Sequence, residues 1–143
     1  MSVGNENFLT EMDIRLFLRD VNPADNTLLD DFEFGQEEIR TASTLAVDYW
    51  NEITPDLGRG YTVVTFPYRY HLLMGTCANL MFIAANLYRR NKLDYNVPGG
   101  GISDQDKYRE YDATGIRMWR DYQAWCAQKK RAINFGLGWG TIG

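Results

Sequence analysis

Few residues of this 143-residue chain combine the type and the spacing that catalysis needs. The single histidine, His71, could act as a general base or as a metal ligand. The chain has no second histidine, however, and no glutamate stands three or four residues after His71. Its apolar helical surroundings instead predict a hydrogen-bonded histidine in the core or at an interface.

Two other groups could bind ions. Asp30, Asp31 and Glu33 could hold a hard cation, but their spacing fits no calcium-binding loop, so a solvated connector is the preferred interpretation. The three glycines at 99–101 precede an expected helix, which is the geometry of an anion-binding turn. No apolar strand precedes them and no Gly-Lys-Ser/Thr follows, and we therefore predict a flexible or tightly turned loop.

The two cysteines complete the search for chemistry. Cys77 and Cys126 lie in apolar helical segments, outside any CxxC spacing and without a nearby histidine. This pattern is typical of reduced core thiols. The sequence thus predicts no catalytic residue, no metal ligand, no cofactor and no enzymatic activity.

Four helices are expected to make up the body of the protein. Apolar residues at helical spacing predict a first helix from Thr10 to Asn22-Pro23, a second over 39–53 and a third over 67–90. A long fourth helix, capped by Ser103 or Asp104, runs towards Asn134. The segment 28–35 is predicted to be an irregular connector whose phenylalanines face the core, and the β-prone segment 61–66 an extended crossing.

The third helix is the most apolar segment. No charged residue occurs between Tyr70 and Tyr88, so its length alone would allow a membrane span. Polar residues interrupt it, and small residues such as Gly75 permit close approach by neighbouring helices. We predict a buried central helix, hence an all-α fold without a membrane partner.

The last residues differ in composition from the rest. Four glycines at 136, 138, 140 and 143 each disfavour a helix by about 1 kcal/mol relative to alanine. Apolar residues alternate with a period of two from Ile133 to Trp139, as in a strand with one buried face. These features predict a helical bundle domain over 1–132 and an extended docking tail over 133–143, which rests on its own domain or, preferably, on another subunit.

Composition excludes some classes of function and favours others. The net charge is −4 and the longest basic run is 129–131, so the chain lacks the basic surface needed to grip nucleic acid. Aromatic residues make up 14%, which favours cores and subunit interfaces. The first residues lack the features of a secretion signal, and synthesis in the cytoplasm is expected.

Several of these segments, in this order, resemble the head-to-tail connector (adaptor or neck) proteins of tailed bacteriophages. The resemblance lies in residues 28–39, the Tyr-Trp-Asn-Glu-Ile-Thr-Pro motif at 49–55, the small-residue helix at 75–85 and the loop at 95–103. Lys130, Asn134 and the Trp139-Gly140 pair extend it to the C-terminal end. The resemblance therefore covers nearly the whole chain.

The resemblance implies a structural protein located in the virion at the head-tail junction. It implies a homo-oligomer, typically of twelve copies, that lies beneath the portal protein and contacts further neck or tail proteins. The genome would pass through its channel without sequence-specific binding, and a negative chain suits such a channel wall. The expected contacts with the portal or an adjacent subunit are Ile133, Asn134, Phe135, Leu137, Trp139 and Ile142.

Two alternatives remain open at this point. The chain could be another phage neck or tail-completion component, which would differ in its partner. It could also be a small helical regulatory protein that binds a ligand near His71. Substitution of His71 separates the last alternative from the others, because only a ligand-binding protein would lose its activity while assembly persists.

Overall fold

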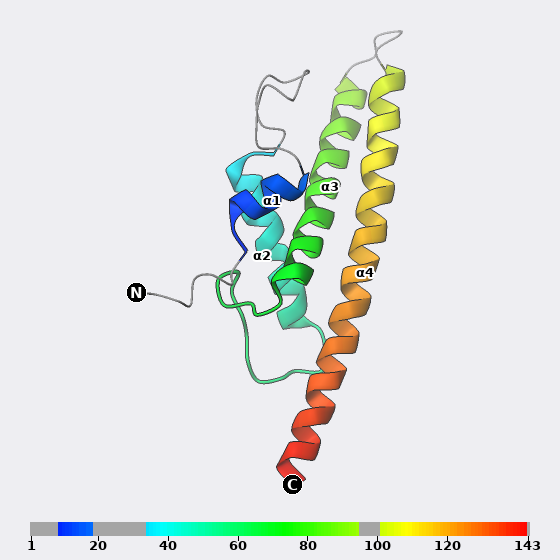
Figure 1. Cartoon of the computed structure of the whole chain (residues 1–143). Helices are drawn as coiled ribbons and strands as arrows, with labels where there is room; N and C mark the ends of the chain where they lie inside the picture. Colours follow the sequence, from blue (N-terminus) through cyan, green and yellow to red (C-terminus); the bar gives the residue numbers. More distant parts are fainter. Residues whose placement is uncertain (1–8, 19–33, 95–100, 143) are drawn as a thin grey trace, which may run out of the picture.

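The computed structural model describes residues 9–18, 34–94 and 101–142, with side chains except at Tyr88, 90–94, 101–107 and 137–142. Its helices are α1 (Glu11–Leu18), α2 (Gln36–Glu52), α3 (Arg69–Asp94) and α4 (Gly101–Ile142). The described ranges contain no strand. The predicted all-α bundle with a long C-terminal helix is therefore confirmed. In Figure 1, α3 lies beside α4, with α2 and the short α1 on its other side.

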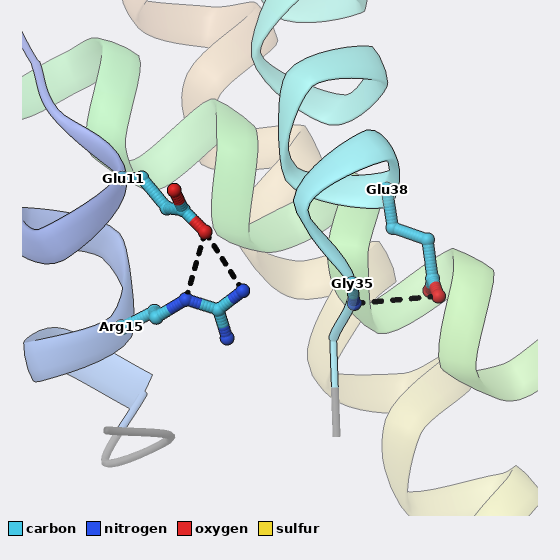
Figure 2. A network of polar contacts seen from close by, with 4 residues as sticks. All are labelled: Glu11, Arg15, Gly35 and Glu38. Atoms are coloured by element: carbon cyan, nitrogen blue, oxygen red, sulfur yellow. Dashed lines mark hydrogen bonds and ion pairs between the residues drawn. The ribbon is translucent and has the colours of Figure 1, made fainter. Parts of the chain in front are cut away.

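Local capping fixes where the first two helices begin. The Thr10 amide donates to the Asp13 carboxylate at 3.0 Å, and the Asp13 amide donates to the Thr10 hydroxyl at 3.2 Å. This reciprocal pair satisfies amides that a helix N-terminus leaves free, and the predicted start of the first helix is confirmed. At α2, Glu38 accepts from the Gly35 amide at 3.5 Å, and Figure 2 places this cap beside the Glu11–Arg15 pair of α1.

The helix α3 is covered by α2 and α4. The Asn79 side-chain amide donates to the Ala42 carbonyl of α2 at 3.1 Å. On the other side, a Cβ at Gly75 would lie only 2.9 Å from the Tyr122 ring of α4. The predicted role of Gly75 in close helix packing is thus confirmed, and the buried Tyr122 hydroxyl reaches past it to donate to Ala46 at 2.5 Å.

The apolar character of α3 also meets a simple test for membrane spans. Residues Arg69–Leu87 have a mean hydropathy of 1.2, and 44% of this window is buried inside the fold. Leu72, Cys77 and Leu80 are fully buried between the neighbouring helices. Their contacts agree with the central core helix that the sequence predicts.

An aromatic cluster packs α2, α4 and the segment before α3 against one another near the C-terminal end of α2. Trp50 at the end of α2 lies 5.6 Å from Phe66 and 5.3 Å from Trp125, measured between ring centroids. Such tilted and edge-on pairs add to the free energy gained from burial. The cluster consists of Tyr49, Trp50, Tyr61, Phe66, Tyr68, Trp119, Tyr122 and Trp125.

A buried lysine closes this cluster at the end of α2. Lys130 is 2% exposed, and its ammonium donates to the Ile53 carbonyl at 2.7 Å while lying 5.5 Å from the Trp50 ring. A cation at a helix C-terminus satisfies a carbonyl that has no intrahelical partner. Burial lowers the pKa of Lys130, although Asp56 opposes this effect. Lys130 therefore ties α4 to the end of α2.

The segment after α2 differs from the extended crossing that its composition predicts. The Asn51 side chain pairs with the backbone of Tyr61, accepting from its amide at 2.9 Å and donating to its carbonyl at 2.8 Å. Beyond Tyr61 the backbone folds into a turn, in which the Phe66 amide donates to the Thr62 carbonyl at 2.9 Å. The turn places Phe66 in the aromatic cluster, and this burial outweighs the β propensity of the segment.

The C-terminal prediction is wrong in its conformation. Residues 133–142 continue α4 instead of forming an extended tail. Extending an existing helix adds a hydrogen bond per residue without a new nucleation step, whereas an isolated strand leaves its backbone unpaired. The alternating apolar residues also satisfy helical spacing, because Ile133 and Leu137, and Phe135 and Trp139, are i,i+4 pairs. The glycines reduce the propensity of this segment without ending the helix.

Two further predictions can be placed. α4 begins at Gly101 and not at Ser103 or Asp104. Phe34 is buried, as the sequence predicts for the connector before α2. Residues 28–33, which include the acidic group, and residues 95–100, which include two of the three glycines, lie outside the described residues.

Candidate docking surfaces

The chemistry-bearing residues are mostly sealed in the core. Cys77 and Cys126 are free and buried, and burial raises the pKa of each thiol to about 12. The prediction of core thiols is confirmed. Among the residues that the structure describes, no three His, Cys, Asp or Glu side chains come together in a way that could hold a metal ion.

His71 lies half-buried at the N-terminal end of α3. Its ring stacks on Trp125 of α4, with centroids 3.9 Å apart and planes 7° from parallel, and meets Tyr70 edge-on. Burial, and then the positive charge of Lys129, lower the pKa of His71. The sequence predicts a hydrogen-bonded histidine in the core or at an interface, whereas the contacts described for this half-buried ring are aromatic. A cavity of about 190 Å³ beside it is lined in part by Met74, Met118 and Asp121.

The C-terminal end of α4 projects beyond the rest of the bundle (Figure 1). The stacked pair of His71 and Trp125 aligns the first turn of α3 with the middle of α4, so the 42-residue α4 continues well past its neighbour. Ile133 still packs against the core. Residues 134–142 extend roughly 13 Å further at 1.5 Å per residue.

This projecting end contains most of the predicted partner-binding residues. Asn134 is exposed, and Phe135 exposes 66% of its surface. A Cβ at Gly136 would meet nothing within 4 Å. Ile133 differs from the other predicted contacts because it is partly buried in its own core, and the side chains of Leu137, Trp139 and Ile142 lie outside the described residues.

A second surface, which the sequence did not reveal, lies between α1 and α3. We call it the α1–α3 groove, with a volume of about 640 Å³. Leu16, Phe17 and Tyr70 are respectively 56%, 50% and 65% exposed. The full lining is Leu9, Asp13, Leu16, Phe17, Arg69, Tyr70 and Leu73. The sequence contained one indication of this groove. Apolar residues lie on more faces of α1 than a single neighbouring helix can cover.

An ion pair spans the polar edge of the α1–α3 groove. Arg69 of α3 lies 2.6 Å from the Asp13 carboxylate of α1. Burial alone would raise the pKa of Asp13, but hydrogen bonds from Thr10 and Arg69 outweigh it and lower the pKa below its ordinary value. The pair fixes α1 against α3 and leaves the apolar floor accessible.

Comparisons with protein-family models, with curated proteins and with solved structures give no match for this chain.

Proposed function

We propose that the chain is a structural virion protein, a head-to-tail connector that forms a subunit assembly beneath the portal of a tailed bacteriophage. In this role it joins capsid to tail and lines the channel through which the genome passes. The observation that carries the proposal is the projecting end of α4, which continues past its own bundle with Phe135 largely exposed. A helix that leaves its own core in this way is suited to docking on another subunit or on the portal.

Two further observations support a binding role. The α1–α3 groove is lined mainly by apolar side chains, three of which are at least half exposed, and apolar grooves of this kind can receive side chains of a partner helix. The thiols are buried and His71 is stacked on Trp125, which suits an architectural role for these residues. Both observations fit a protein whose activity is assembly.

The direct test is electron microscopy of the purified chain, alone and mixed with the portal protein of the same phage. We expect closed, rotationally symmetric particles, with about twelve subunits, in at least one of the two samples. Native mass spectrometry gives the copy number. A chain that stays monomeric in both samples contradicts the proposal.

Truncation tests the role of the projecting end. Because Ile133 packs against the core, the deletion should remove residues 134–143 and retain Ile133. We expect loss of assembly or portal binding with an unchanged melting transition of the bundle. The matched control is Leu45→Asp, because Leu45 is 48% exposed on α2, away from the projecting end, and this variant should keep binding. A truncated chain that assembles and docks normally removes the projecting end from the proposal.

The cavity beside His71 favours one second candidate, a small helical ligand-binding or regulatory protein. Its volume of about 190 Å³ would admit only a small ligand. His71→Gln separates the two candidates, since an assembly protein should retain its oligomers and portal binding. Loss of a measured binding activity with intact assembly would favour the ligand-binding function.

A further inference from the structure

The proposed function leaves open which surface receives the projecting end of α4. We infer that it inserts into the α1–α3 groove of an adjacent copy of this chain. This inference rests on the proposed function, because it specifies the contact between subunits within the connector. The shape of the helix, the apolar surface of the groove and the charge of both regions support this contact.

The shape of α4 suits a helix-in-groove contact. Residues 134–142 remain helical beyond the core, and the positions of Phe135, Trp139 and Ile142 share one face by their i, i+4, i+7 spacing. Helices that bind grooves use anchors at this spacing. The extended strand expected from the sequence would have needed a sheet edge, whereas a helix needs an apolar channel.

The α1–α3 groove provides such a channel. Leu16 and Phe17 expose about half of their surface, and Tyr70 exposes more, so an incoming aromatic side chain can be buried against all three. The groove has about 640 Å³ of space, enough for one or more large side chains. Burial of Phe135 there would remove apolar surface from water on both subunits.

Charge favours a second copy as the occupant. Residues 1–68 contain thirteen acidic and four basic residues, whereas residues 69–143 contain six acidic and eleven basic residues. The helices α1 and α2 alone carry six carboxylates against two guanidinium groups. After Asp121 the chain has no acidic residue, and Lys129 and Arg131 precede the projecting end, whereas Lys130 is buried in its own bundle. A basic helix end thus approaches an acidic layer, which favours correct encounter.

The two surfaces belong to different regions of the chain, so the contact between copies is heterologous. Each subunit donates its α4 end to one neighbour and receives an α4 end from the other. A heterologous contact produces a closed assembly when its rotation closes and a filament when it does not. This geometry agrees with the cyclic connector proposed above.

The experiment uses two full-length variants that each damage one surface. Phe17→Asp changes the groove and Phe135→Asp changes the projecting end, and both positions are at least half exposed, so folding should be preserved. Leu45→Asp is the matched control, because Leu45 is 48% exposed on α2 and lies outside the groove lining. Circular dichroism verifies the fold of each variant.

Sedimentation velocity and native mass spectrometry then measure assembly. We expect each groove or helix-end variant to weaken self-association by roughly 30-fold or more, as for the loss of a central interface anchor. The control should assemble like the unmodified chain. Mixing the two variants should give a 1:1 heterodimer that grows no further, since one intact groove meets one intact helix end.

Each other outcome has a defined meaning. If both variants assemble like the unmodified chain, the inference is overturned and the proposed connector stands. Two monomeric variants that give no heterodimer overturn the pairing of these two surfaces. If the heterodimer forms but the unmodified chain builds only open filaments, the inference stands and the proposed connector falls. An unmodified chain that remains monomeric overturns both.

Discussion

The aromatic cluster and the α1–α3 groove are built from similar residues in opposite situations. In the cluster, Trp50, Phe66 and Tyr122 are fully buried, and the Lys130 ammonium satisfies the carbonyl at the end of α2. In the groove, Phe17 and Tyr70 remain half exposed or more. Aromatic side chains are therefore fully buried in the cluster and only partly buried in the groove. The connector function proposed above needs both conditions, because the first keeps the monomer folded and the second would provide free energy for association.

The largest expected effect concerns the buried aromatic cluster. Trp50→Ala removes the central ring of the aromatic cluster and leaves a cavity beside Phe66 and Trp125. We expect the free energy of unfolding to fall by about 3–5 kcal/mol, measured by urea denaturation of the monomeric chain.

The matched change in the α1–α3 groove is Phe17→Ser. Because Phe17 is half exposed, its replacement should alter the free energy of unfolding by less than about 1 kcal/mol. Equal losses in the two variants would show that the groove is part of the stabilising core, and the comparison would fail.

A pair of glycines makes the same comparison within the two long helices. A Cβ at Gly75 would lie 2.9 Å from the Tyr122 ring, whose hydroxyl is held by Ala46. Gly75→Ala should therefore destabilise the fold by about 1–3 kcal/mol.

Gly136→Ala should have the opposite sign. The added methyl group meets nothing within 4 Å, and replacing glycine in a helix gains up to about 1 kcal/mol. Thermal unfolding followed by circular dichroism measures both variants. A stabilised Gly75→Ala variant would contradict the tight packing of α3 against α4.

The smallest expected effect concerns pH at the margin of the aromatic cluster. Burial, together with Lys129, lowers the pKa of His71, so the unfolded chain binds the proton more readily than the folded chain. Stability should therefore be lost as the pH falls below about 6.5, the ordinary value for histidine. The loss between pH 7 and pH 5 should be smaller in His71→Gln. NMR titration of the single histidine gives its pKa directly, and a value above the ordinary one contradicts this account.

Features that depend on neighbouring residues in the sequence were predicted correctly, whereas features that depend on distant residues were not. The start of α1 after the Thr10 cap and the end of α2 before Pro55 depend on residues within one turn, and both were predictable from local patterns, whereas α2 begins at Gln36, three residues before the predicted start. The turn at 62–66 was not predicted. Thr62 and Thr65 pair within it, but the burial of Phe66 in the distant aromatic cluster, which opposes the β propensity of the segment, is not visible in the local pattern. The α1–α3 groove was missed for the same reason, since no local pattern reveals which face of α1 is left uncovered.

The sequence alone determined the helical class, the buried α3, the inert cysteines and the apolar character of the C-terminal end, because helical periodicity and composition express these properties locally. Tertiary structure decided the conformation and direction of that end. The residues from Ile133 to Trp139 fit both a strand and a helix in their spacing, so α4, already formed against the bundle, continues through them, and the docking of Lys130 and Ile133 sets the direction in which it continues. Tertiary structure also left the groove between α1 and α3 open, since α1 is short and packs through Ile14 while Phe17 stays accessible.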